Sequence, residues 1–195
     1  TIKKYLLLES QPDVGGRMST DLVGDHQLDR GFQVFIKGYP LYDAVIDVKQ
    51  LPLHSFSPGA SIRMNNRFYK VVDPFRNIIE GFKSIFTPIG SFIDKLKILK
   101  LRISLLLKKT DNIKNNISTY NYLKQNGFSD EMINNFFIPF FGSVLLDQDL
   151  STVKSTFETI YKAMSSDDIC LLENGIADFF LILSRMLLVV IVFYK

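Results

Sequence analysis

The chain of 195 residues has one cysteine, two histidines and no tryptophan. The lone cysteine, Cys170, cannot form an internal disulfide, and it argues against a cysteine-based metal site. Neither histidine, His26 or His54, has a partner at the spacing of metal ligands or of a Ser/His/Asp triad. We therefore expect no metal centre and name no catalytic residue. The single thiol favours a reducing compartment, so we expect a cytoplasmic protein, or a plastid one if the organism is a photosynthetic eukaryote.

The chain also has little excess of either charge, with a formal net charge of +3, and 47% of its residues are hydrophobic. This composition is that of a folded protein. The positive charge is concentrated between Gly81 and Asn126, where nine Lys or Arg residues face two acids. Such a region favours anionic surfaces. Because no nucleic-acid-binding motif accompanies it, we expect no nucleic acid partner.

Long hydrophobic runs are scarce as well. The apolar tail from Phe179 to Tyr194 is sixteen residues long and is interrupted by Ser184 and Arg185. It falls short of the ~20 residues that a membrane-spanning helix needs. Its pattern instead predicts a helix over 176–186 and, from its β-branched and aromatic residues, a strand over 189–194.

An apolar run near the N-terminus ends in an acid. Tyr5 to Leu8 has no polar interruption, which predicts a strand buried on both faces of a parallel sheet. The residue that ends such a strand, Glu9, faces the crevice at the carboxyl edge of the sheet. A carboxylate there can accept both hydroxyl hydrogens of an adenosine ribose.

A glycine pair and an arginine follow Glu9 by six residues. Gly15 and Gly16 lack a Cβ, so the backbone can pass close to a pyrophosphate or adopt a positive φ. Arg17 adds a permanent charge and a planar fork of donors, and Thr20 adds a hydroxyl. The stretch thus predicts a nucleotide cofactor site.

Together these residues form the string E-x5-G-G-R-x-x-T followed by L-D-x-G, which resembles the FAD-dependent amine oxidase superfamily, including protoporphyrinogen oxidases and phytoene desaturase-like enzymes. The runs at 51–75 and 136–157 resemble a desaturase-like branch. The resemblance implies that Glu9 binds the adenosine ribose of FAD and that Gly15, Gly16 and Arg17 lie along its pyrophosphate and flavin. It also implies an oxidoreductase that oxidises CH–CH or CH–NH bonds of a fairly apolar substrate, with the flavin accepting the hydride or electrons.

Two motifs of that family have no counterpart in the chain: the opening G-x-G-x-x-G turn and the C-terminal FAD motif. We therefore expect a fragment of a longer enzyme that binds FAD weakly or not at all. The alternative is a non-catalytic or degenerate fragment that acts at a membrane surface or on a partner through its basic helical region.

The expected fold class is α/β, or α+β for the chain as a whole. Residues 1–50 and 170–195 are expected to form a partial Rossmann-like FAD/NAD(P)-binding domain. Residues 51–169 are expected to form an inserted substrate domain, with a hairpin around Asn65-Asn66 and a mostly helical remainder. Asp73 before Pro74 predicts the N-cap of the first of these helices.

One predicted helix carries an apolar stripe with lysines and an arginine beside it. The stripe recurs at spacings of four and three over Phe92, Leu96, Leu99, Ile103 and Leu106. One interpretation is a helix whose stripe faces the core and whose basic face is solvated. The other is a helix that lies on anionic lipid, which would make the protein peripheral to a membrane.

A second candidate site is the run Phe136 to Gly142, which places four phenylalanines around a proline. Phe137, Phe140 and Phe141 could wall a pocket for an apolar substrate. The alternative is that these side chains belong to the core.

Overall fold

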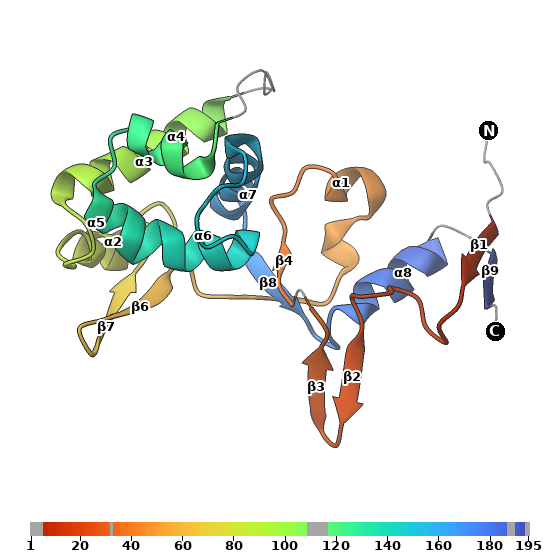
Figure 1. The fold of residues 1–195 in the computed structure, drawn as a ribbon. Coiled ribbons are helices and arrows are strands. Elements are labelled where there is room, and N and C mark those ends of the chain that lie inside the picture. The colour runs from red at the N-terminus through yellow and green to blue at the C-terminus, as the bar shows by residue number, and fades with distance from the viewer. Residues whose placement is uncertain (1–5, 32, 109–116, 187–189, 194–195) are drawn as a thin grey trace. The chain divides into compact units, whose positions relative to one another are not determined.

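The computed structural model describes residues 6–31, 33–108, 117–186 and 190–193 (Figure 1). The chain forms two compact units, one made of Thr1–Phe56 with Asp167–Lys195 and the other of Ser57–Ser166. Each unit has its own hydrophobic core. The described residues contain both helices and strands, which is consistent with the predicted α/β class. Lys109 and Lys114 of the predicted basic region lie outside the described residues.

The first unit joins the two ends of the chain through a pair of parallel strands. Strand β1 (Leu6–Glu9) pairs with β9 (Val190–Phe193), so that Glu9 lies opposite Phe193. Helix α8 (Ala177–Met186) precedes β9, which confirms the helix and strand predicted for the tail. The prediction that β1 is buried on both faces is wrong for Leu8, which is 65% exposed. The reason is that, within the described residues, β9 is the single neighbour of β1.

The other strands of the first unit are antiparallel. Two of them form a hairpin, and three more form a sheet in which β8 lies between β4 and β5. A core of six buried residues lies beside them. These remaining elements are β2 (Thr20–Val23), β3 (His26–Asp29), β4 (Phe35–Ile36), α1 (Tyr42–Val45), the 3-10 helix η1 (Val48–Gln50), β5 (Leu53–Ser55) and β8 (Ile169–Leu172).

The second unit opens with the predicted hairpin. Strands β6 (Ala60–Met64) and β7 (Arg67–Val71) pair antiparallel through Asn65 and Asn66, whose φ angles are 50° and 64°. Two consecutive positive φ angles define the tight turn that matches the twist of a hairpin, and asparagine tolerates them. The prediction of this hairpin is confirmed.

The rest of the second unit is helical. Serine side chains accept hydrogen bonds from the first-turn N–H groups of three of its helices, α3, α4 and α5. The helices enclose a core of twelve buried residues, among them Leu101, Leu123 and Phe157. The elements are α2 (Ile78–Ile85), α3 (Phe92–Leu107), α4 (Thr119–Gln125), α5 (Asp130–Met132), the π-helix η2 (Ile133–Phe137), α6 (Ile138–Leu145) and α7 (Lys154–Ser166).

Asp73 is not the N-cap of α2. That helix begins at Ile78, because the side chain of Asn77 accepts a hydrogen bond from the N–H of Glu80 and caps the helix there. Asp73 instead accepts from the N–H of Phe75 at 3.0 Å and forms an ion pair with Arg102.

Helix α3 turns the predicted stripe outward. Phe92 is 60% exposed, Leu96 49% and Ile103 45%, whereas Leu101 and Leu105 are each 3% exposed. The interpretation of a core-facing stripe is therefore wrong. The physical reason is that α3 is apolar on both faces, and the face with Leu101 and Leu105 packs in the core.

The predicted solvated basic face of α3 is also wrong in part. The Nζ of Lys95 donates to the backbone carbonyls of Ile85 and Thr87, each at 2.6 Å, and Arg102 pairs with Asp73. In the described part of the chain, no helix combines the length and the hydropathy that crossing a membrane requires.

Candidate cofactor site

Glu9 stands at the carboxyl end of β1, as predicted. Its Oε1 accepts a hydrogen bond from the N–H of Gln11 at 2.9 Å, which holds the half-buried carboxylate at the start of the following loop. No hydrogen bond among the described residues uses its Oε2. As far as the described residues go, this oxygen can accept a hydroxyl hydrogen from a ligand.

The glycine pair forms a turn that only glycine can make at its first position. Gly15 has a φ of 111°, and the N–H of Met18 donates to its carbonyl at 3.0 Å. A Cβ on Gly15 would lie 2.7 Å from the carbonyl oxygen of Met18 and 3.2 Å from the ring of Phe180 in α8. Gly16 differs, because a Cβ there would meet nothing within 4 Å. The backbone of Gly16 is open to a ligand, whereas Gly15 fits tightly against its own protein.

Arg17 follows the turn with an exposed side chain. Within the described residues its guanidinium has no hydrogen bond or ion pair, and none joins it to Glu9. Its donor fork is free to bind an anionic group such as a phosphate.

Thr20 is used inside the protein. Its hydroxyl donates to Oδ1 of Asp29 at 2.6 Å and accepts from the N–H of Ala177 at 3.1 Å. Oδ1 of Asp29 also accepts from the N–H of Ile176 at 3.0 Å. Residues of β2 and β3 thus cap the N-terminus of α8. The N–H groups of Ile176 and Ala177 already have acceptors, so they do not need a phosphate to bind there.

This network gives Thr20 a role that needs no cofactor, and its predicted part in cofactor binding stays a prediction. Asp29 belongs to the L-D-x-G string but was not predicted as a site residue. No local sequence signal marks this role, because the N-terminus of the helix that Asp29 caps lies 147 positions later in the chain.

The three phenylalanines of the predicted substrate pocket differ in burial. Phe137 and Phe141 are 0% and 2% exposed and pack with Phe157 in the core, where the rings of Phe141 and Phe157 lie 4.8 Å apart. Phe140 is half-buried and stacks on Phe136 at 5.9 Å. Packing accounts for the two buried rings, so the predicted pocket depends on Phe140.

Glu9 offers an acceptor that suits ribose hydroxyls, and the exposed backbone of Gly16 and guanidinium of Arg17 offer donors that suit phosphates. These are the groups that the sequence predicted for a nucleotide cofactor site. A comparison with protein families agrees. The model of the flavin-containing amine oxidoreductase family matches residues 3–179. The chain therefore belongs to this family of flavin-dependent oxidoreductases, whose cofactor is FAD, and the predicted resemblance is confirmed. No individual curated protein matches the chain.

Proposed function

We propose that Glu9, Gly16 and Arg17 bind FAD and that Gly15 forms the tight turn that positions Gly16 and Arg17. The observation that carries the proposal is the position of Glu9 at the carboxyl end of a parallel strand, with one carboxylate oxygen without a hydrogen bond among the described residues. In this assignment Glu9 accepts from the adenosine ribose, Gly16 lets the pyrophosphate approach its backbone, and Arg17 neutralises phosphate charge.

The first unit then belongs to a Rossmann-like FAD-binding domain, and the second unit carries the substrate region. The bound flavin supplies the acceptor for a hydride or electrons, while the chain supplies binding, orientation and electrostatics. We propose oxidation of CH–CH or CH–NH bonds of a fairly apolar substrate. The half-buried pair Phe136 and Phe140 supports an apolar substrate, because stacked rings offer a surface without hydrogen-bonding groups.

The test is to express the full reading frame of the gene, add FAD to the purified protein and record its absorption spectrum after removing free cofactor. We expect a flavin band at one FAD per chain. A folded protein that retains no flavin after this treatment would overturn the proposal. That outcome would favour the alternative, a non-catalytic or degenerate fragment that acts at a membrane surface or on a partner through its basic helical region.

A further inference from the structure

Helices α2 and α3 each present an apolar face to solvent. On α2 the exposed residues follow one side of the helix, with Phe82 61% and Phe86 86% exposed. On α3 they follow the stripe that starts at Phe92. Exposed apolar surface of this extent marks an interaction site, since folded proteins rarely leave it uncovered. The full set is Ile78, Ile79, Phe82, Phe86, Phe92, Ile93, Leu96, Ile103, Leu106 and Leu107, each at least 40% exposed.

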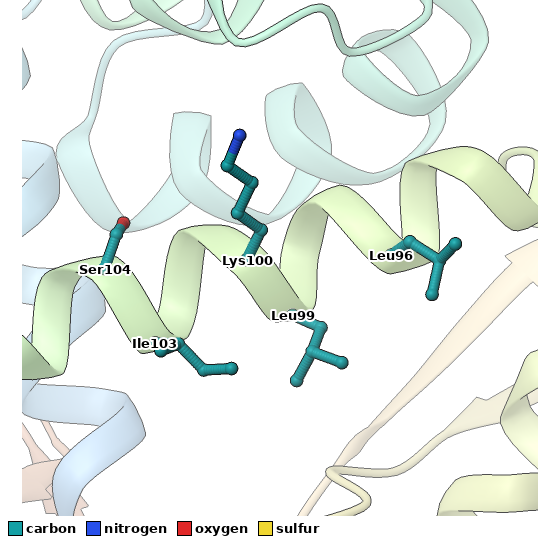
Figure 2. Close-up of a pocket in the computed structure, with 5 residues that line it drawn as sticks. All are labelled: Leu96, Leu99, Lys100, Ile103 and Ser104. Carbon is teal, nitrogen blue, oxygen red and sulfur yellow. The ribbon is translucent and has the colours of Figure 1, made fainter.

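The outward face of α3 has a hollow with a cation beside it. Leu99 and Ile103 project from one side of the helix, and Lys100 and Ser104 project from the other (Figure 2). These four residues and Leu96 line a shallow hollow of about 350 Å³ along the helix. Lys100 is exposed and has no hydrogen bond or ion pair within the described residues. Aliphatic side chains beside a free ammonium suit a ligand with hydrocarbon next to a negative group.

The charge on these helices is positive and is only partly neutralised by acids: Lys83, Arg102 and Lys108 pair with Glu80, Asp73 and Glu158, whereas Lys95, Lys97 and Lys100 have no carboxylate partner among the described residues. From Ile78 to Lys108 there are six Lys or Arg residues and two acids. Glu80 accepts from Lys83 at 2.6 Å, and Asp94 is only 1% exposed, so neither presents an unpaired carboxylate to solvent. Lys95 and Lys97 donate to backbone carbonyls, which leaves their positive charges uncompensated by a carboxylate.

The loop between the helices is fixed by one of these lysines. Because Lys95 of α3 binds the carbonyls of Ile85 and Thr87, it ties the end of α2 to the first turn of α3. Phe86 and Phe92 flank this junction. The two apolar faces are therefore held on a connected, ordered segment.

We propose that the outward faces of α2 and α3 dock on an anionic phospholipid bilayer. The apolar side chains would enter the interface between head groups and acyl chains, and Lys100 would meet the phosphates. Charge decides against a second copy of the chain as the partner, because self-pairing would bring two sets of uncompensated lysines together. The inference does not depend on flavin binding.

The absence of tryptophan from the chain allows a direct test. The single substitution Phe86→Trp places one fluorophore on the proposed face, and Phe68→Trp, at a position 71% exposed on β7, is the matched control. With vesicles of phosphatidylcholine and phosphatidylserine we expect the emission of F86W to shift to the blue and that of F68W to stay unchanged. Vesicles of phosphatidylcholine alone should shift neither.

Surface variants extend the test, since exposed positions leave the fold intact. We expect the double variant L96Q/I103Q to lower partition into anionic vesicles by more than about tenfold and K100Q to lower it by about fivefold. The controls are L22Q/L28Q on the exposed hairpin of the first unit and K49Q, which should bind like the parent chain. Circular dichroism checks that each variant is folded.

Three outcomes would overturn the proposal: no vesicle binding by the parent chain, equal binding to neutral and anionic vesicles, or a blue shift of F86W without lipid. The last, together with a dimer in sedimentation that L96Q/I103Q dissociates, would identify a second copy as the occupant.

Discussion

At the scale of the residue, the proposed cofactor site depends on the carboxylate of Glu9. One of its two oxygens has no hydrogen bond within the described residues. We expect Glu9→Gln to weaken FAD binding by roughly tenfold to a hundredfold, because hydrogen bonds to a charged acceptor contribute about 1.5–3 kcal/mol. Titration of the apoprotein with FAD, followed by flavin fluorescence, measures this. Asp13→Asn, in the same exposed loop, is the control. Equal affinities of Glu9→Gln and the parent would show that Glu9 is not the ribose ligand.

Asp94 in the second unit is a buried acid whose partners are all hydrogen-bond donors. Its Oδ2 accepts from the N–H and the hydroxyl of Ser91 and from the hydroxyl of Ser129, and its Oδ1 accepts from the N–H of Ser129. Burial raises the pKa of Asp94, but the bonds from Ser91 and Ser129 outweigh it and lower the pKa to about 2. Asp94 completes the capping box of α3 with the N-cap residue Ser91, and its bonds to Ser129 tie α3 to the start of α5.

This geometry makes the stability of the second unit depend on acid pH. The pKa of Asp94 is lower in the folded state than its ordinary value of 3.8, so its contribution is present above pH 4 and is lost as the pH falls towards 2. We expect Asp94→Asn to lower the free energy of unfolding by about 2 kcal/mol at pH 7, and by about half as much at pH 3. Urea denaturation at both pH values checks this, with Asp130→Asn, at an exposed position, as the control. An equal loss at the two pH values would contradict the assignment.

Among the helices and strands, α8 depends on residues far away in the chain. Thr20 and Asp29 cap its N-terminus from the hairpin of β2 and β3. We expect Thr20→Val, which keeps the shape and removes the hydroxyl, to destabilise the first unit by about 1–2 kcal/mol without any FAD present. Hydrogen exchange should show faster exchange in the first turn of α8. If the stability of the apoprotein did not change, the role of Thr20 would lie in cofactor binding alone.

The elements that could be predicted from the sequence are those set by local chemistry. Asn65 and Asn66 between alternating strands specify a hairpin, and Ser118 and Ser129 mark helix starts. Helix α3 could be predicted only in part. The spacing of its apolar residues indicates a helix, but because they lie on two faces, the spacing does not show which face packs against the core. The buried face is decided largely by packing against α7, whose Phe157 and Tyr161 are more than fifty positions away in the chain.

Part of the candidate site could likewise be predicted from the sequence and part could not. Glu9, Gly15, Gly16 and Arg17 stand within nine residues, so their pattern is visible in the sequence. The cap that Asp29 makes on α8 is not visible in the sequence. Its hydrogen bond joins Asp29 to the N–H of Ile176, which is 147 positions away. Neither propensity nor spacing carries information over such a separation, and only the folded chain brings these groups together.

The whole molecule is organised as one unit inserted into another. Ser55 of β5 pairs with Cys170 of β8, and the N–H of Phe56 donates to the carbonyl of Ile169 at 2.9 Å. The chain therefore leaves the first unit and returns to it at neighbouring points of one antiparallel sheet. Since the second unit also has its own core of twelve buried residues, it has what an independent folding domain requires.

We therefore expect residues 57–166, expressed alone, to fold cooperatively, with a helical circular dichroism spectrum and a single transition in urea. Leu123→Asp should abolish the transition, because Leu123 is 0% exposed and a charge there would have no partner. Leu146→Asp, at a position 92% exposed, is the matched control and should leave it within about 0.5 kcal/mol of the parent. A broad, non-cooperative loss of structure in the parent segment would show instead that the second unit needs the strands of the first to fold.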